Sequence, residues 1–591
     1  MPQPSRRALL AGLAAAPALA APALAAWPAA ALAGRHGRVR PGQPGWPSEA
    51  DWSALNGAVG GRLKPVALPD LADPAVRGLV DNPFWLGDQA GLTESSGYAD
   101  AWRSAPSAYA LRAGGAGDVA AAVRFAAARR LRLVVKGGGH SYLGGSNAPD
   151  SLLVWTRGLD AIESHEAFTP LGGSGPGVPA VSVGSGNVWL HAYHAVTTAG
   201  GRYVQGGGCT SVGVAGLVQG GGFGSYSKRY GLAAASLLEA QIVTADGRVR
   251  IVNAHREPDL FWALKGGGGG TFGVVTRLTL RTHELPATFG AFRWKVQAKS
   301  DAAFQRLLAR FVRLYAETLC NPHWGEQVGA QRDNSLEVNM VFQGLGAAQA
   351  RAAWSELESF VKASPGDYAA PVAPLALDLP ARQFWNGDFL AKVGAATLDK
   401  RADARPGDFW WTGDGEQAGA FWHGYASVWL PSSLLKGDGP DRLAAAWFAA
   451  SRHAGVGFHF NKGLYGADPE TLAASADTSM NPQVLDAFAL AITGAAGPSA
   501  FPGFPAPDLA FARSRGEQVA LADAALRQAI PNGGAYVSEC DYHLKGWQDA
   551  CWGVHYPRLA AIKRRYDPDG LFTVHHGVGS EGWSADGFTR T

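Results

Sequence analysis

Clusters of glycine constrain the fold of this chain more than any other feature of its sequence. Of its 591 residues, 78 are glycine, and many of them gather in three short stretches, 137–145, 206–224 and 266–273. Glycine at this density does not form a stable ordinary helix, but it lets the backbone lie against a ligand because no Cβ intervenes. A GC-rich genome would also enrich glycine, yet the placement of the clusters fits that explanation less well. The clusters therefore predict loops that contact a large planar or polyanionic molecule.

The overall composition is that of a globular protein without a nucleic-acid partner. Apolar residues make up 47% and charged residues 17% of the chain, which excludes a disordered protein. The net charge of +3 is too small for nucleic-acid binding, which shows as a basic stripe. The chain has four cysteines and no CxxC pair, so we expect no metal site. One disulfide is possible in an oxidising compartment, with Cys540 and Cys551 as the suspected pair.

The first 34 residues have the pattern of a targeting segment. Arg6 and Arg7 precede an apolar, alanine-rich run, and Ala-Leu-Ala cleavage sites follow at 18–20, 23–25 and 31–33. This arrangement predicts a bacterial signal peptide, and the paired arginines indicate the twin-arginine route. We therefore expect a secreted or periplasmic protein with no membrane span after removal of the segment. An uncleaved membrane anchor is the alternative, against which the prolines of the run argue.

A β-α-β unit and a hairpin are predicted in the first half of the chain. A strand at 108–112, a helix at 118–130 and a strand at 131–136 form the unit. Apolar runs at 237–243 and 248–252 are joined by an Asp-Gly turn, which is the strongest short-range hairpin signal. These elements predict that the first and second glycine clusters lie on a mixed helix-and-strand framework.

The pattern of elements predicts an α+β fold with several parts. Residues 35–100, rich in Pro, Gly and Trp, are expected to form an irregular leader. Residues 101–285 carry the glycine clusters, and residues 286–530 have longer helical stretches, at 304–318 and 347–363, and aromatic-rich strands that predict a second domain. Residues 531–591 form a compact C-terminal segment.

Two of the glycine clusters hold side chains that can act as nucleophiles. His140 follows three glycines directly after a predicted strand, and the bare N–H groups of such a loop can point at a pyrophosphate. Cys209 stands in the second cluster. Taken singly, each would more often be an ordinary surface or packing residue. The third cluster contains a formal GxGxxG, but it leads into a strand, which excludes the Rossmann interpretation.

Together these motifs resemble the FAD-binding fold of vanillyl-alcohol oxidase and its relatives, and within it the berberine bridge enzyme-like branch. The GGGHSY and GGS stretches at 137–146 match the loop that carries that family's flavin-linked histidine. Cys209 stands in the branch's motif Cys-x-x-Val-Gly-Val-x-Gly-x-x-x-Gly-Gly-Gly-x-Gly. The run at 552–572 is similar to the C-terminal signature. The resemblance is strong over about 101–285 and 531–575.

The resemblance implies a two-part PCMH-type FAD-binding domain with an inserted α+β substrate domain at 286–530, after which residues 531–591 return to the FAD-binding domain as a berberine bridge enzyme-like segment. It also implies FAD bound through two covalent bonds, from His140 to the flavin 8α-methyl group and from Cys209 to C6. Imidazole and thiolate are suitable nucleophiles for these carbons. The other implied cofactor-binding residues are Gly137, Gly138, Gly139, Ser141, Gly144, Gly145, Gly208, Gly213, Gly216, Gly220, Gly221, Gly222, Gly224, Gly273 and Val275.

The implied reaction is oxidation of a C–H bond beside O or N in a carbohydrate, alcohol or amine. Flavin N5 takes hydride, a side chain takes the proton, and molecular oxygen reoxidises the flavin. Oxygen use does not follow from the motifs, so a dehydrogenase with another acceptor and a flavin-binding protein without turnover remain alternatives. Aromatic stretches at 409–411 and 421–423 predict either the wall of a substrate pocket or core.

The side-chain base is expected in the segment 535–541, which the resemblance implies to be a substrate-side strand. Many relatives carry Tyr where this chain has Glu539, and Asn where it has Ser538. Glu539 and Tyr536 are therefore the candidate catalytic residues, with Tyr142 in support. A buried glutamate whose pKa is raised can act as a base. An ordinary ion pair of Glu539 is the alternative.

Overall fold

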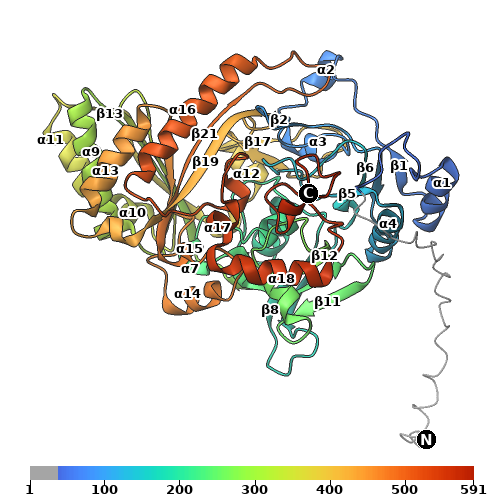
Figure 1. The fold of residues 1–591 in the computed structure, drawn as a ribbon. Coiled ribbons are helices and arrows are strands. Elements are labelled where there is room, and N and C mark those ends of the chain that lie inside the picture. Colours follow the sequence, from blue (N-terminus) through green and yellow to red (C-terminus); the bar gives the residue numbers. More distant parts are fainter. Residues whose placement is uncertain (1–36) are drawn as a thin grey trace, which may run out of the picture.

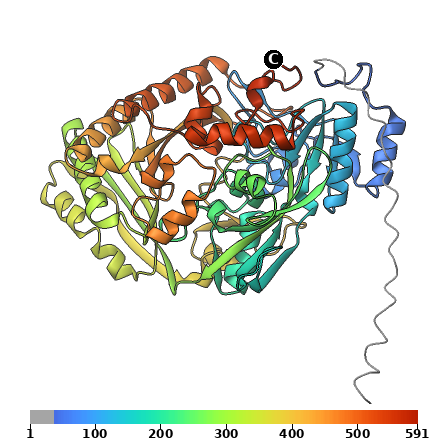
Figure 2. The same ribbon diagram turned by 60° about the horizontal axis from the view of Figure 1, so that its bottom comes forward.

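The computed structural model describes residues 37–591, and its fold is α+β as expected (Figure 1). The predicted signal peptide, residues 1–34, lies outside the described residues. Sheets of four, six and nine strands form the body of the molecule. Figure 2 shows the C-terminal helices, in red, crossing the region that the blue, cyan and green segments build. Within residues 37–591, no helix is both long and apolar enough to cross a membrane.

The four-stranded sheet confirms the predicted β-α-β unit. Its strands, in spatial order, are β1 (Leu63–Pro65), β4 (Tyr109–Arg112), β6 (Ser151–Trp155) and β5 (Arg132–Lys136). Helix α4 (Ala116–Arg129) connects β4 to β5, and both strands run parallel to β6, which lies between them. Because β5 ends at Lys136, the first glycine cluster begins where the chain leaves the sheet.

The six-stranded sheet confirms the predicted hairpin. Its order is β11 (Val249–Asn253), β10 (Leu237–Val243), β12 (Val274–Glu284), β8 (Val178–Gly184) and β7 (Ile162–Phe168), with β9 (Arg202–Val204) also beside β12. The β10–β11 turn contains Gly247 at φ +70°, a left-handed conformation that glycine adopts without strain. Helices α6 (Val214–Gln219) and α8 (Pro258–Leu264) bury their apolar side chains in the same core.

The nine-stranded sheet is the framework of the second half of the chain. Its order is β16 (Tyr368–Pro380), β13 (Thr288–Ala298), β15 (Ser335–Gln343), β14 (Trp324–Ala330), β20 (Val456–His459), β21 (Ala487–Gly497), β19 (Phe421–Pro431), β2 (Gly97–Tyr98) and β3 (Trp102–Arg103). Helices α9 (Asp301–Leu314), α13 (Gly439–Ser451) and α16 (Leu509–Arg527) share a large core with it and lie together on one side in Figure 1.

The prediction of an irregular leader at 35–100 is wrong. Helix α1 (Glu49–Ala58), capped by the side chain of Ser48, packs on the four-stranded sheet. Helix α3 (Pro83–Gly87) follows, and β2 pairs in parallel with β19. These elements are too short for a periodic apolar pattern, and β2 pairs both with the adjacent β3 and with β19, a strand more than 300 residues away, which no local signal reveals.

Two long predicted helices are interrupted. The helix expected at 304–318 is α9 followed by a π-helical turn at Tyr315–Leu319. The helix expected at 347–363 is divided into α10 (Ala347–Ala352) and α11 (Ser355–Ala363). Trp354, between them, is fully buried and stacks on Phe292, with ring centroids 4.4 Å apart. Packing of this large ring ends one helix and starts the next.

The C-terminal segment packs beneath the glycine clusters. Helices α17 (Trp547–Trp552) and α18 (Tyr556–Tyr566) form in this segment, and Phe572 bridges in parallel to Leu133 of β5. The buried ammonium of Lys563 donates to the Thr271 carbonyl at 2.6 Å, which ties α18 to the third cluster. The strand expected at 535–541 is wrong, because only a 3₁₀ turn forms there, at Val537–Glu539. Cys540 and Cys551, the suspected disulfide pair, are free thiols.

Candidate functional site

The three glycine clusters meet in one place. A Cβ built on Gly138 would lie 2.5 Å from the Gly213 nitrogen, and one built on Gly269 would lie 3.7 Å from the Gly216 Cα. A side chain at Gly138 would therefore push the first cluster off the second, and the third cluster lies at ordinary van der Waals distance from the second. The absence of side chains is what allows these backbones to approach one another.

His140 reaches from the first cluster to the second. Its Nε2 lies 3.1 Å from the Ser211 hydroxyl oxygen and 3.9 Å from a carboxylate oxygen of Glu94. Burial lowers the pKa of His140 to about 4. The imidazole is therefore neutral near pH 7, and one of its ring nitrogens keeps a lone pair.

Cys209 faces a carboxylate. Its Sγ lies 3.9 Å from Oδ1 of Asp414. The charge of Asp414, followed by burial, raises the pKa of the Cys209 thiol, and burial raises the pKa of Asp414 to about 6. The indole N–H of Trp411 donates to the Gly208 carbonyl at 2.9 Å. The segment from Trp411 to Asp414 therefore covers the Cys209 loop.

Glu94 links backbone segments around His140. Its N–H donates to the Gly139 carbonyl at 3.0 Å, and its carbonyl accepts from the Gly419 N–H at 2.7 Å. Burial, followed by the charge of Asp414, raises the pKa of Glu94 to about 8. The side chain is therefore protonated near pH 7 and can donate a hydrogen bond.

Aromatic rings surround the predicted tyrosines. The ring of Tyr142 packs against Trp422 and Tyr425, with centroids 4.7 and 5.1 Å away. Tyr536 packs edge-on against Phe223 at 5.1 Å. Burial raises the pKa of both predicted tyrosines well above the usual range, so both phenols stay protonated. The aromatic stretches 409–411 and 421–423 supply Trp411 and Trp422 to this region as well as buried core residues.

Glu539 forms an ion pair. The Lys462 ammonium donates to its two carboxylate oxygens at 2.5 and 2.7 Å. Glu326 lies nearby and accepts from the Ser225 hydroxyl at 2.6 Å. The charges of Lys462, Glu326 and Glu539 all act on the Cys209 thiol. Glu539 therefore belongs to the same polar surroundings as Cys209, but its charge is neutralised.

Several predicted cofactor residues contact protein atoms. An added Cβ would come within about 2.5 Å of neighbouring protein at Gly138, Gly221, Gly222, Gly224 and Gly273. Val275 is 3% exposed and lies in the core of the six-stranded sheet. Gly216, in contrast, has no atom within 4 Å of an added Cβ. The remaining predicted glycines, and Ser141, lie on the loops that meet around His140 and Cys209.

The residues present fit FAD. Four buried polar atoms beside the glycine clusters have no hydrogen-bond partner among residues 37–591: Glu94 Oε2, Thr210 Oγ1, Gln219 Oε1 and Thr271 Oγ1. Buried polar atoms normally find partners, and the ring and phosphates of FAD offer both donors and acceptors. A Cβ added at Gly216 would meet no atom within 4 Å, so the backbone is open there.

Four charged residues of the site were missed by the sequence analysis: Glu94, Glu326, Asp414 and Lys462. None stands in a glycine cluster or in a recognisable motif, and they lie on four separate segments of the chain. Only Asp414 had a nearby signal, because it follows the aromatic stretch at 409–411.

Comparison with known proteins agrees with this picture. Residues 107–253 match the FAD binding domain family, and residues 535–579 match the family described as berberine and berberine like. The FAD-linked oxidoreductase notD' of Aspergillus versicolor is 29% identical over 94% of this chain and 90% of its own length. The VAO-type flavoprotein oxidase VAO615 of Thermothelomyces thermophilus is 27% identical over 94% of each chain.

Solved structures share the fold. The VAO-type flavoprotein MtVAO615 of Myceliophthora thermophila superposes with a TM-score of 0.77 at 25% identity, covering 94% of this chain and all of that one. The glucooligosaccharide oxidase of Acremonium strictum, described with a 6-S-cysteinyl, 8α-N1-histidyl FAD, superposes with a TM-score of 0.64 at 18% identity, covering 89% of this chain and 99% of that one.

The comparisons correct the expected localisation. The relatives in Aspergillus, Malbranchea aurantiaca and Gibberella zeae are fungal rather than bacterial, and their names do not indicate secretion. The assignment to bacterial export by the twin-arginine route is therefore wrong.

The FAD binding match contains the first two glycine clusters, the berberine-like match lies on the C-terminal segment that packs against the third, and relatives align along nearly the whole chain. The chain is therefore an FAD-linked oxidoreductase that carries an FAD binding domain and a berberine-like domain and is similar to flavoproteins of the vanillyl-alcohol-oxidase type.

Proposed function

We propose that this oxidoreductase holds FAD covalently through both His140 and Cys209 and acts as an oxidase of a small molecule. The observation that supports this most is the contact between the two loops, in which Ser211, two residues from Cys209, lies at hydrogen-bond distance from His140. Both nucleophiles therefore face one region of bare backbone. We propose further that residues 101–285 and 531–591 form the FAD-binding part and residues 286–530 the substrate part.

The protonation states of the two residues suit their roles differently. The imidazole of His140 is neutral, since burial lowers its pKa to about 4, and can act as a nucleophile directly. The Cys209 thiol, whose pKa is raised, must lose its proton first, and Asp414 is the carboxylate 3.9 Å away that can accept it. FAD, when bound, supplies the electron-accepting ring for hydride transfer.

Asp414 is also our candidate for the base that takes the substrate proton. Its pKa of about 6 is close to working pH, which suits a general base. No cation pairs with Asp414 among residues 37–591, whereas Glu539 is paired with Lys462. Tyr142 and Tyr536 keep their protons at neutral pH, so we propose that they orient the substrate.

The proposed substrate is a carbohydrate, alcohol or amine, which is oxidised at a C–H bond beside O or N. Among structural neighbours, a carbohydrate oxidase from Microdochium nivale has a TM-score of 0.63. Peroxide release under air with panels of sugars, alcohols and amines tests oxygen use. Flavin bleaching without peroxide would identify a dehydrogenase with another acceptor, and a flavin that no panel bleaches would favour a binding protein without turnover.

Mass spectrometry of tryptic peptides tests the double attachment. We expect one flavin adduct joining the His140 and Cys209 peptides. The Cys209→Ala variant should retain covalent flavin on the His140 peptide alone. Flavin released entirely by acid precipitation of the unmodified protein would rule out the covalent proposal.

The base is tested by comparing Asp414→Asn with Glu539→Gln. Flavin reduction by substrate without oxygen should slow by about 100-fold or more in Asp414→Asn, with flavin content unchanged. Flavin reduction should slow less in Glu539→Gln. That variant leaves Lys462 without its counter-ion but keeps Asp414, the proposed base. If Glu539→Gln slows flavin reduction more than Asp414→Asn does, Glu539 is the base instead.

A further inference from the structure

A small hairpin carries the residues that cover Cys209. We call residues 396–414 the cover hairpin, which consists of β17 (Ala396–Leu398), β18 (Phe409–Trp411), their connecting loop and the turn to Asp414. β17 and β18 pair only with each other in the described sheets. A two-stranded hairpin is marginally stable alone in water. The position of Trp411 and Asp414 therefore depends on what fastens this hairpin to the rest of the molecule.

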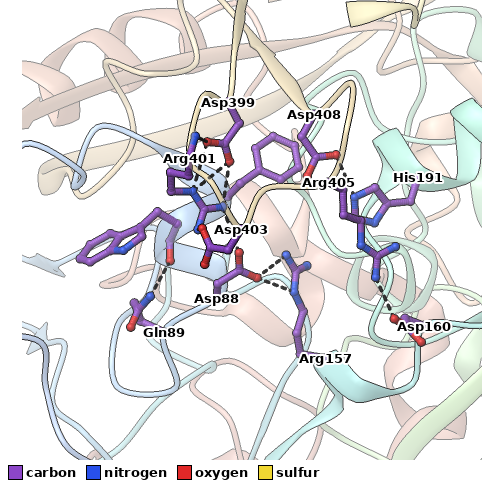
Figure 3. A network of polar contacts seen from close by, with 12 residues as sticks. Asp88, Gln89, Arg157, Asp160, His191, Asp399, Arg401, Asp403, Arg405 and Asp408 are labelled. Atoms are coloured by element: carbon purple, nitrogen blue, oxygen red, sulfur yellow. Dashed lines mark hydrogen bonds and ion pairs between the residues drawn. The ribbon is translucent and has the colours of Figure 1, made fainter. Parts of the chain in front are cut away.

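Arg401 provides the central fastening (Figure 3). Its guanidinium donates to both carboxylate oxygens of Asp399, at 2.8 to 3.1 Å, and to Asp88 at 3.1 Å. Arg157 donates to the other oxygen of Asp88, at 2.6 and 2.9 Å. The side chains of Arg401 and Asp399 are only 10% and 0% exposed. A buried forked ion pair of this kind fixes geometry.

The helix α3 presents both of its ends to the hairpin. Asn82, its N-cap, donates to Asp399 Oδ1 at 3.0 Å, and Asp88 is its C-cap. The next carbonyl, that of Gln89, accepts from the buried ammonium of Lys136 at 2.6 Å. Lys136 is the last residue before the His140 loop. A continuous chain of polar contacts therefore runs from the base of that loop to the cover hairpin.

We propose that Arg401 is a positioning residue, which holds the cover hairpin so that Asp414 and Trp411 stay against the Cys209 loop. His191, 3.1 Å from Asp408, fixes the other strand end. The loop between β17 and β18 makes a weaker contact, between Arg405 and Asp160. Their side chains are 2.8 Å apart and about half exposed, and exposed ion pairs contribute little to stability. Arg401 and Arg405 thus offer a matched pair, in which one loop arginine fastens the hairpin and the other does not.

Hydrogen exchange of the flavin-loaded protein tests the fastening without reference to turnover. In Arg401→Met, Asp399 loses its partner, so amides of 396–414 should exchange at least about ten-fold faster, while β5 and β6 stay unchanged. Arg405→Met should exchange as the wild type does. If Arg401→Met does not fold, Asp88→Asn, which keeps the shape of the side chain, should show the same local increase. Unchanged exchange of 396–414 would overturn the proposal.

A pH profile separates positioning from simple stability, and this readout rests on the proposed role of Asp414. The groups that face Asp414 are Cys209, Glu326, Glu94 and Tyr142, and none is altered. Release of the hairpin exposes Asp414, so the acid limb of flavin reduction should move from about pH 6 toward about 4. Suppose that Asp414→Asn abolishes the acid limb of flavin reduction. If Arg401→Met then speeds the hydrogen exchange of 396–414 without moving that limb, Arg401 has only a structural role. If Asp414→Asn retains the acid limb, Asp414 is not the base. The positioning role of Arg401 is then tested by hydrogen exchange of residues 396–414 alone.

Discussion

Burial, more than pairing, sets the protonation of the residues around His140. Desolvation is the largest cause of the lowered pKa of His140 and Lys136, and of the raised pKa of Glu94. Each group is therefore pushed toward its neutral form. A site of this kind holds protons loosely near neutral pH and avoids fixed charges where a large ligand is expected.

Glu94 should make the protein less stable as pH rises. Its pKa of about 8 lies above the ordinary 4.5, so the folded state binds more protons than the unfolded state between about pH 4.5 and 8. The contribution of Glu94 to the free energy of unfolding is complete below about pH 4.5. It is lost as the pH rises to about 8, at up to roughly 1.4 kcal/mol per pH unit. Glu94→Gln should therefore gain thermal stability relative to the wild type at pH 8 but not at pH 4.5. A parallel pH dependence in both proteins would contradict this.

The sequence could indicate His140 and Cys209 because each stands in a glycine motif whose spacing is local. Asp414 and Glu94 have no such pattern, and they reach the site only through the folded path of the chain. Glu539 lies in the expected segment, but its ion pair with Lys462, 77 residues away, could not be foreseen. Local motifs thus indicate nucleophiles, whereas the charges that govern them come from tertiary contacts.

Among the elements, helix α16 and strand β19 approach unusually closely. A Cβ on Gly516 would lie 2.5 Å from the His423 carbonyl oxygen, and one on Gly424 would lie 2.9 Å from the Gly516 Cα. The two glycines let the helix backbone rest on the strand. The sequence shows neither glycine as special, because the partner of each lies on another element.

Gly516→Ala should destabilise the protein, although alanine is the better helix former. The methyl group would meet the His423 carbonyl, and overpacking of this kind costs about 1–3 kcal/mol. Ser514→Ala, at an exposed position of the same helix, should be neutral or slightly stabilising. Thermal unfolding of the two variants decides this, and equal melting temperatures would contradict the close approach.

Elements with long periodic patterns, such as the β-α-β unit and the β10–β11 hairpin, were predicted correctly. The segment 535–541 was expected to be a strand, but its backbone bonds locally, with the Glu539 N–H donating to the Tyr536 carbonyl at 2.9 Å. β2 and β3 have two residues each, and they pair with each other while β2 also pairs with the distant β19. Propensity carries no information at that length.

In the whole molecule, a buried lysine is one of the residues through which the C-terminal segment holds the third glycine cluster. Lys563 donates to Thr271, Phe572 and Asp567, each at 2.6 Å. The hydrogen bond to Thr271 joins chain segments almost 300 residues apart.

Lys563→Met should therefore lower the stability of the whole protein, and should also loosen the third cluster. It leaves the buried Asp567 carboxylate without its cation, and breaking a buried pair costs about 3–5 kcal/mol. Arg564→Met, on the exposed face of the same helix, is the control and should unfold as the wild type does. Thermal unfolding, with protease cleavage near residues 266–273 as a local probe, measures both effects.

The route of the chain between its sheets limits how the molecule can move. β1 lies in the four-stranded sheet, β2 and β3 join the nine-stranded sheet, β4 to β12 return to the four- and six-stranded sheets, β13 crosses again to the nine-stranded sheet, and Phe572 comes back to β5. Because the chain passes between these sheets several times, we expect the two parts to move little relative to each other when a substrate binds. Solution scattering should then give the same radius of gyration with and without a substrate.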